Sequence, residues 1–142
     1  MAGKTPFKVE VLTPEGEVFN DEVVEVVTRT SVGDIGILAH HVPVLAMLDP
    51  TELRLFKSEG DVVTYAQGEG FLQVAPGGEH VLLLVDEVHE PGKINASDYE
   101  EKLRRAEDQL SKAERFSAEE RDARRDKRRY EAYLKVASGS AS

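Results

Sequence analysis

The segment HEPGKINASDYE, residues 89–100, divides the chain into two parts with different sequence patterns. Before Pro91, short apolar runs are separated by turns that contain glycine, whereas residues 94–138 contain neither glycine nor proline. Charge changes at the same place: residues 1–93 hold six basic and sixteen acidic side chains, and residues 94–142 hold twelve and eleven. We therefore expect an acidic body over residues 1–90, a hinge over 91–96, a helical arm over 97–137 and a disordered tail over 138–142.

The first part has the pattern of an antiparallel β-sandwich, or flattened barrel. Residues 7–11 alternate apolar and charged side chains, the period-two pattern of a half-buried strand. Further apolar runs follow at 23–28, 53–56, 62–66, 71–74 and 80–85, and the first of them is rich in β-branched residues. Short strands separated by turns are typical of sandwiches and barrels. The glycines at 68–70 and 77–78 are interpreted as parts of hairpin turns.

The stretch GDIGILAHHVPVL, residues 33–45, interrupts this regular spacing. Gly33 and Gly36 permit a positive φ or a close backbone approach. Pro43 cannot donate a ladder hydrogen bond, so residues 39–43 are predicted to form a loop. His40 and His41 are adjacent, and neighbouring side chains on an extended chain point to opposite faces. Zinc would also require a third and a fourth ligand, so we expect a loop that packs or contacts a partner, and no metal site.

The second part has the pattern of an antiparallel helical hairpin. Ser97 and Glu100 fit a capping box, and Ser117 and Glu120 fit a second one, which places a break near Phe116. Each predicted helix carries one narrow apolar seam: Tyr99, Leu103, Ala106, Leu110 and Ala113 on the first, and Ala123, Tyr130, Leu134 and Ala137 on the second. Short isolated helices are marginal in water. Each helix must therefore pack its seam against the other helix, the sandwich or a partner.

The second predicted helix is locally basic. Its cationic residues are Arg121, Arg124, Arg125, Lys127, Arg128 and Arg129. One interpretation, which charge alone favours, is a solvated face with intrahelical ion pairs. The other is an electrostatic contact with an acidic partner surface. Binding to nucleic acid is disfavoured, because acidic residues interrupt the basic run and the acidic body repels phosphate.

The sequence lacks the common motifs of catalysis. The chain has no cysteine, which excludes disulfides, thiolate nucleophiles and zinc ribbons. It has no glycine-rich phosphate loop with a following lysine and no serine in a nucleophile elbow. Residues 1–6 lack the apolar stretch of a secretory signal, and no apolar run approaches the roughly 20 residues of a membrane-spanning helix. We expect a non-catalytic interaction protein without cofactors, which reaches a membrane only through a partner.

A longer motif within residues 33–48 connects these features to a known family. It reads Gly-x-x-Gly-x-Leu-x-x-His-x-Pro, formed by Gly33, Gly36, Leu38, His41 and Pro43 and followed by Leu45 and Leu48. With the length of the sandwich and the charged hairpin, it resembles the epsilon subunit of F-type ATP synthases. Residues 67–74 and 82–86 also look like strands of that family, and the resemblance covers nearly the whole chain in order and length.

The resemblance implies a function and a set of partners. In the family, the sandwich contacts the gamma subunit and the c-ring at the foot of the rotating central stalk, on the cytoplasmic face of the bacterial cell membrane. Rotation is thereby coupled to proton-driven ATP synthesis. The helical hairpin either folds beside the sandwich or extends toward the alpha/beta catalytic head, where it blocks ATP hydrolysis. The chain would be a subunit of the proton-transporting ATPase without a catalytic site of its own.

Particular residues take expected roles from the resemblance. Asp34, His40 and His41 occupy the loop that matches the c-ring contact. For the basic residues of the second helix, we hypothesise contacts with the acidic carboxy-terminal region of the beta subunits; these are Arg121, Arg124, Arg125, Arg128 and Arg129.

The chain departs from the family at one motif. Many bacterial relatives bind ATP through Ile/Leu-Asp-x-x-Arg-Ala at the start of the first helix, where this chain has Ile94, Asn95, Asp98 and Tyr99 at the four specified positions. An acid where phosphate requires a cation is unfavourable. We therefore expect no ATP binding. The alternative to the whole assignment is an unrelated β-sandwich adaptor with a coiled-coil interaction arm.

Overall fold

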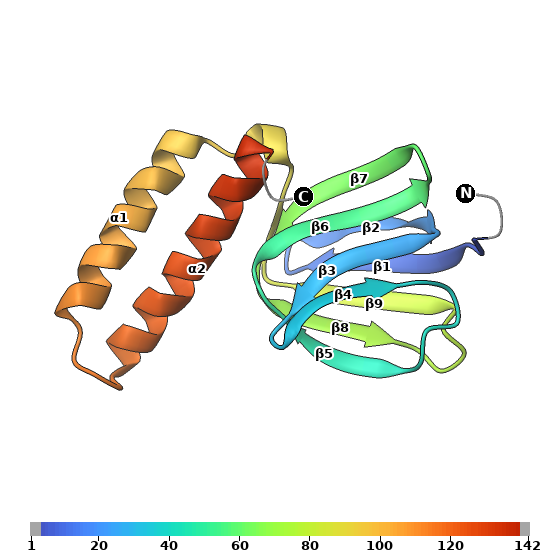
Figure 1. The fold of residues 1–142 in the computed structure, drawn as a ribbon, viewed down its shortest axis with the longest axis horizontal. Coiled ribbons are helices and arrows are strands. Elements are labelled where there is room, and N and C mark those ends of the chain that lie inside the picture. Colours follow the sequence, from blue (N-terminus) through green and yellow to red (C-terminus); the bar gives the residue numbers. More distant parts are fainter. Residues whose placement is uncertain (1–3, 140–142) are drawn as a thin grey trace.

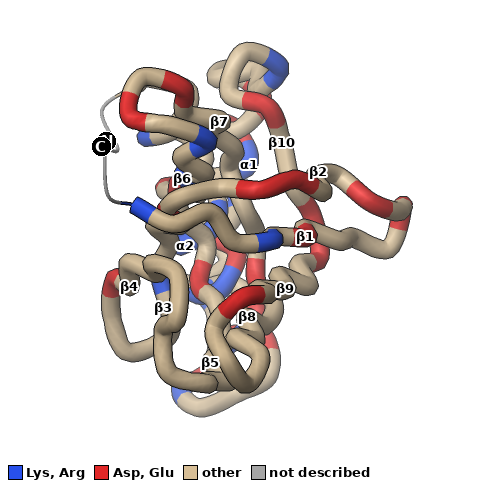
Figure 2. The backbone as a smooth tube through the Cα atoms, turned by 90° about the vertical axis from the view of Figure 1, so that its right-hand side faces the viewer, with Lys and Arg blue, Asp and Glu red and all other residues tan. Residues whose placement is uncertain are grey.

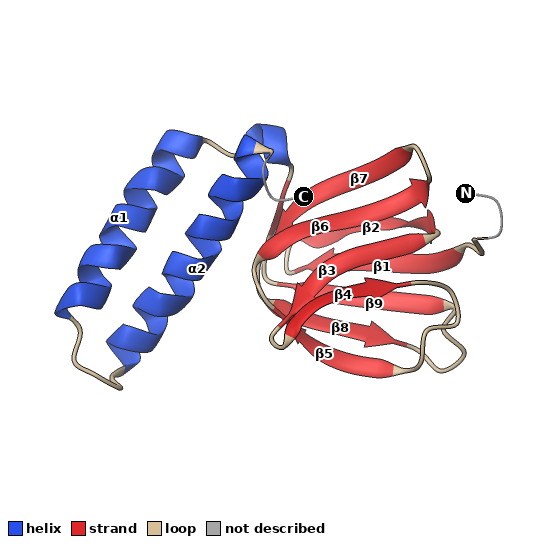
Figure 3. Cartoon of the chain, viewed as in Figure 1, coloured by secondary structure: helices blue, strands red, loops and turns tan. Residues whose placement is uncertain are grey.

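Ten strands are followed by two long helices in this computed structural model, which describes residues 4–139 (Figure 1). The strands are β1 (Phe7–Thr13), β2 (Gly16–Val23), β3 (Glu25–Thr30), β4 (Gly33–Ile37), β5 (Val44–Leu48), β6 (Thr51–Ser58), β7 (Asp61–Gln67), β8 (Gly70–Val74), β9 (His80–Val85) and β10 (Val88–His89). A 3₁₀ turn, η1 (Pro91–Lys93), leads into α1 (Ala96–Lys112) and α2 (Ala118–Ser138). The expected fold, a sandwich followed by a helical hairpin, is confirmed (Figure 3).

The strands form one bent sheet in the order β10-β7-β6-β3-β5-β8-β9-β1-β2, with β4 paired to β3. At the bend, β3 and β5 share a single residue pair, Thr30 with Leu48. The strands on either side of this corner fold over one another as the two layers of the sandwich (Figure 1). Pairing is antiparallel except between β1 and β9, which run parallel.

The glycine segment at 68–70 is not a hairpin turn, contrary to the sequence-based interpretation. β7 pairs with β6 and β10, whereas β8 pairs with β5 and β9. Gly68 and Glu69 therefore carry the chain from one layer to the other. The turn at Gly77 and Gly78 does connect the antiparallel pair β8 and β9.

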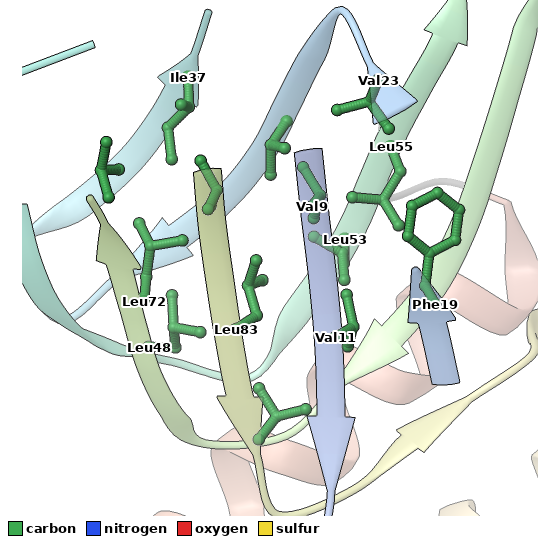
Figure 4. Close-up of a cluster of buried hydrophobic side chains, with 14 of the residues drawn as sticks. Val9, Val11, Phe19, Val23, Ile37, Leu48, Leu53, Leu55, Leu72 and Leu83 are labelled. Atoms are coloured by element: carbon green, nitrogen blue, oxygen red, sulfur yellow. The ribbon is translucent and has the colours of Figure 1, made fainter. Parts of the chain in front are cut away.

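The core lies between the two layers (Figure 4). On β1, Phe7, Val9 and Val11 are buried, and the charged residues between them are not, as the alternating pattern predicted. Fifteen buried hydrophobic residues form one contiguous cluster. Because burying a Val or Leu side chain contributes about 1.5–3 kcal/mol, this cluster is the main source of the sandwich's stability.

The outer face of β5, β8 and β9 is apolar. Met47 lies opposite Phe71 on β8, and Phe71 lies opposite Leu84 on β9. These three side chains, called the apolar row below, are 60 %, 49 % and 46 % exposed. Leu45, 72 % exposed, extends the face along β5. Contiguous exposed apolar residues of this kind mark interaction surfaces.

The helix ends differ from the sequence-based prediction at α1 and agree at α2. Asn95, not Ser97, caps α1: its side chain accepts a hydrogen bond from the Asp98 amide, and Ser97 Oγ donates to it at 2.8 Å. α1 ends at Lys112 rather than near Phe116. Ser117 caps α2 as predicted, accepting from the Glu120 amide at 3.1 Å.

The second helix reaches one residue into the stretch 138–142 that was predicted as a tail. α2 includes Ser138, and Gly139 caps its C-terminus with φ of 75°. That left-handed backbone is typical of glycine at this position. The rest of the expected tail, 140–142, lies outside the described residues.

The two helices bury their predicted seams unequally. Four of the five residues of the first seam lie on α1 and the fifth, Ala113, is its C-cap; all five are buried or half-buried, and the remaining residues of α1 are exposed. On α2 Ala123 is buried as predicted, but Tyr133 and Val136, which are not in the predicted seam, are buried as well. They belong to a second apolar strip, through which α2 contacts the sandwich.

Candidate functional site

Two connections of the sandwich lie beside one another and bring three carboxylates together. The Gly68 amide donates to the Glu87 carbonyl at 2.9 Å, and the Asp86 amide donates to the Glu69 carbonyl at 2.8 Å. The Glu69 amide also donates to Asp86 Oδ1 at 2.9 Å. Glu69, Asp86 and Glu87 thereby form one group, called the acidic triad below.

The close approach depends on the absence of side chains at two glycines. A Cβ on Gly68 would overlap Asp86 Oδ1 and would lie 3.1 Å from the hydroxyl of Tyr133. A Cβ on Gly70 would overlap the Leu84 carbonyl oxygen. Neither glycine has a positive φ. Their role is therefore to leave room for neighbouring groups, which explains why glycines stand at positions 68 and 70, where β8 begins.

Helix α2 docks on the acidic triad through Arg129. Its guanidinium donates to Asp86, to Glu87 Oε1 at 3.0 Å and to Glu69 Oε1 at 3.3 Å. The side chain is only 16 % exposed. Hydrogen bonds between ionised groups are about twice as strong as neutral ones. Arg129 is therefore the central polar contact between the two parts of the chain.

The other predicted arginines divide into two sets. Arg125 and Arg128 also face Glu69, at 3.9 and 3.6 Å, and remain about half exposed. Arg121 and Arg124 are exposed, and Arg124 lies 3.5 Å from Glu120 of its own helix. Three of the five predicted partner-binding arginines thus contact the sandwich in this conformation, and two face solvent.

Tyr133 ties the docked helix to the same carboxylates. Its hydroxyl donates to Glu87 Oε1 at 2.7 Å, and its ring is fully buried. Burial raises the pKa of Tyr133, and the hydrogen bond to the Glu87 carboxylate raises it further. Burial would raise the pKa of Glu87, but the Tyr133 hydrogen bond and the Arg129 charge outweigh it, so that pKa lies below its ordinary value. Glu87 is therefore ionised near neutral pH.

The apolar part of the docking contact is small. Its buried residues are Ala66 on β7 with Tyr133 and Val136 on α2, and Ile94, Tyr99 and Ala132 pack against them. This cluster of three is separate from the fifteen-residue core of the sandwich. The hairpin could therefore leave the sandwich without exposing the main core.

Aromatic rings fill the space beside the start of α1. Tyr99 packs against Tyr130 and Tyr133, with ring centroids 5.8 and 5.5 Å apart. His89 of β10 lies against Tyr133 at 5.3 Å. At the positions of the altered nucleotide motif, Tyr99 thus belongs to this aromatic group and Asn95 is the helix cap. The other two positions are Ile94, which packs on the small apolar cluster, and Asp98, which is exposed.

The structure does not bring Asp34 together with His40 and His41. Asp34 lies at the start of β4, where it is 70 % exposed and accepts a hydrogen bond from Arg29 Nε at 2.7 Å. That bond lowers the pKa of Asp34. The two histidines follow the other end of β4, in the loop that leads to β5 (Figure 1). The predicted contact residues therefore occupy opposite ends of one strand.

The histidine loop packs against the turn between β8 and β9. The His40 amide donates to the Gly78 carbonyl at 2.9 Å, and His40 has a left-handed φ of 65°. A Cβ on Gly78 would overlap the His40 backbone. Within residues 4–139, no group of three or more His, Cys, Asp or Glu side chains could hold a metal ion.

Sequence reasoning missed the residues that form the docking contact. On α2, Arg129, Tyr133 and Val136 follow at spacings of four and three, which places them on one helix face. This spacing is a signal that the sequence contains, and it marks a second face of α2 beside the predicted seam. The acidic triad gave no comparable signal, because Glu69 lies seventeen positions from Asp86 along the chain.

Comparisons with known proteins agree with the fold and the sequence pattern. Residues 6–91 match the family model "ATP synthase, Delta/Epsilon chain, beta-sandwich domain". The chain is 33 % identical over 132 residues to the ATP synthase epsilon chain of Sulfurihydrogenibium sp. (strain YO3AOP1), covering 93 % of this chain and 97 % of that one. It is 35 % identical to the epsilon chain of Persephonella marina, covering 92 % and 96 %.

Solved structures show the same architecture. A chain of the Euglena gracilis mitochondrial ATP synthase matches with a TM-score of 0.78 at 18 % identity, covering 89 % of this chain and 78 % of that one. A chain of the Tetrahymena thermophila mitochondrial ATP synthase, from a structure of its central stalk and c-ring, matches with 0.67 at 12 % identity, covering 98 % of both.

The β-sandwich of this chain is thus that of the delta and epsilon chains of ATP synthases. With its helical hairpin and its similarity over nearly the full length of curated relatives, the chain belongs to the ATP synthase epsilon-chain family. The alternative of an unrelated sandwich adaptor is therefore wrong. Among the helices of residues 4–139, none is long and apolar enough to cross a membrane.

Replacing Arg129 with alanine is expected to loosen the docked helix. The variant loses several hydrogen bonds to ionised acceptors and leaves three neighbouring carboxylates without their shared cation. A hydrogen bond to a charged group contributes about 1.5–3 kcal/mol. Amide hydrogen exchange in α2 should therefore accelerate roughly ten- to hundredfold, while β-strand amides keep their rates.

Arg124→Ala is the matched control, since Arg124 lies on the same helix and faces solvent. Equal exchange rates for α2 in the two variants would show that Arg129 does not hold the helix.

Proposed function

We propose that this chain is a non-catalytic subunit of the central stalk, whose sandwich transmits rotation and whose helical hairpin inhibits ATP hydrolysis. The sandwich binds the gamma subunit and the c-ring, and the hairpin reaches the alpha/beta head when it is extended. The chain lies at the cytoplasmic face of the bacterial membrane, held there by the complex. The coupling of gamma and c-ring rotation to proton-driven ATP synthesis passes through the sandwich.

The observation that carries the proposal is the contact between α2 and the sandwich. It combines a small apolar cluster with ion pairs that water or another acidic surface could replace. A switch requires two states that differ by only a few kcal/mol. In the docked state Arg125, Arg128 and Arg129 pair with the acidic triad. In the extended state the same arginines would pair with the acidic region of beta.

The apolar row supports binding to the gamma subunit. This row runs across three neighbouring strands, through Met47 on β5, Phe71 on β8 and Leu84 on β9. These strands belong to the layer that does not include β7, the strand that packs against Tyr133 and Val136 of α2. About half of the surface of each of these side chains is exposed in the isolated chain. Burying them against a partner would contribute roughly 25 cal/mol for each Å² removed from water.

The end of the sandwich that carries Asp34 supports the contact with the c-ring. Val32, 95 % exposed, lies at the tip of the β3–β4 hairpin, next to Gly33 and Asp34. An exposed apolar side chain beside an exposed acid suits a protein surface of mixed character. His40 and His41 lie at the other end of β4, so we assign the ring contact to Asp34 first.

Exposed arginines on α2 provide the test of inhibition. In a complex reconstituted with Arg121→Glu/Arg124→Glu, the hairpin still docks, because neither residue contacts the acidic triad. Repulsion from the acidic region of beta should then raise ATPase activity severalfold, toward that of a complex whose chain lacks residues 94–142. Reversing Arg124, Arg125, Arg128 and Arg129 together should also relieve inhibition, although that variant disturbs docking as well.

Arg104→Glu, on the exposed face of α1, is the control. If the deletion activates the enzyme and the charge reversals leave ATPase activity unchanged, the arginines have no part in inhibition. If the deletion itself has no effect, the hairpin is not an inhibitor.

Single cysteines test the ring contact, since the chain has none of its own. Asp34→Cys should crosslink to a c-subunit loop in the intact complex, whereas His41→Cys, at the other end of β4, should crosslink much less. A crosslink from position 41 with none from position 34 would reverse the assignment.

Nucleotide binding is not part of the proposed function. Aromatic rings occupy the space beside the start of α1, and Asp98 adds a negative charge there. Titration calorimetry with ATP should therefore give no heat of binding at micromolar concentrations of the full chain. A micromolar dissociation constant would contradict this expectation.

A further inference from the structure

On the basis of the proposed function, we propose that the partner of the apolar row competes for Glu69 with the docked hairpin, so that partner binding favours hairpin release. The partner surface would have an apolar centre with a Lys or Arg at its edge. Under the proposed function this partner is the gamma subunit. Glu69 would then couple the surface that grips the stalk to the arm that inhibits hydrolysis.

Glu69 lies where the apolar row meets α2. One hollow of about 510 Å³ is lined by Met47 and Phe71 together with Glu69 and Arg128. A second hollow, of about 380 Å³, is lined by Leu84 together with Glu69 and Asp86. Glu69 is shared by both hollows. A partner that covers the apolar row therefore also covers Glu69.

Charge around these hollows favours a basic partner. Their carboxylates are Asp49, Glu69 and Asp86, and the basic residue that lines them is Arg128. Arg128 belongs to the hairpin and is 54 % exposed. When the hairpin leaves, no basic side chain of the described sandwich lines these two hollows, and Arg29 beside Asp49 is the nearby cation of the sandwich. Complementary charges across an interface then call for a cation on the partner.

Glu69 is held by the hairpin through several imperfect contacts. Its Oε2 lies 3.6 Å from Arg128, and its Oε1 lies 3.3 Å from Arg129 and 3.9 Å from Arg125. Arg129 has shorter contacts with Asp86 and Glu87. A partner cation entering beside Phe71 would meet Oε2 and displace Arg128. The excluded water would strengthen the new pair.

Linkage makes the coupling measurable in the reverse direction. If the partner favours release of the hairpin, release must favour the partner by the same factor. Arg129→Ala loosens the hairpin and leaves the apolar row unchanged. It should therefore bind a complex of alpha, beta and gamma subunits, prepared without this chain, roughly five- to tenfold more tightly than wild type, a factor at the low end of allosteric couplings.

A double-mutant cycle separates this gain from contacts of the released hairpin with the catalytic head. Glu69→Gln in the Arg129→Ala background should remove most of the gain, because the partner's cation loses its acceptor. Glu79→Gln in the same background neutralises an exposed acid beyond the turn after β8 and should leave the gain intact. Circular dichroism of the β-sheet signal checks that each variant is folded.

The outcomes separate the two hypotheses. Unchanged or weaker binding by Arg129→Ala overturns the coupling. A gain in affinity that survives Glu69→Gln also overturns it, because the gain would then come only from contacts of the released hairpin with the catalytic head. If the wild-type chain does not bind the complex at all, the proposed function fails together with the coupling.

Discussion

The conformation of the whole molecule depends on three carboxylates that share one guanidinium. Glu69, Asp86 and Glu87 come from two connections that backbone hydrogen bonds hold side by side. Like charges at this distance repel, and Arg129 offsets the repulsion from within the second helix. The sandwich therefore provides an acidic site that is satisfied when the helix is present. Without the helix, the same site is a negatively charged surface open to another cation.

The two parts of the chain differ in what holds them together. The sandwich has a contiguous core of fifteen buried hydrophobic residues, whereas the hairpin meets it through three. Ion pairs at a partly exposed contact are screened by salt and can be exchanged for other ion pairs. Acidic side chains also gather along β2 and in the turn before it (Figure 2). Among the acidic side chains of residues 4–139, Glu69, Asp86 and Glu87 are the ones that form ion pairs with Arg129 of α2.

Local patterns in the sequence were sufficient for the two-part fold. On β1, apolar and charged residues alternate, and on α1 the apolar residues form one seam. Each pattern reflects one face of the element packed against one neighbour, and the structure shows both buried faces. The start of α1 was misplaced because Asn95 and Ser97 are both good caps, and the choice between them depends on the chain that precedes them. The docking contact could not be predicted in the same way. Tyr133 contacts the sandwich as well as α1, and the crossover at Gly68 depends on strand order, which no local pattern encodes.

The parallel pairing of β1 with β9 has a consequence for how the molecule forms. Residues 7–13 are synthesised well before residues 80–85, with which they pair. The sheet therefore cannot be completed until most of the sandwich has been made. Pairings between distant segments slow folding, because the long loop must close before its contacts form. Until then β1 can pair with β2 on one edge, and its other edge lacks its partner β9. The hairpin is synthesised after β9, so the surface on which it docks can be complete before α2 emerges, and the first conformation open to a newly made chain is the docked one.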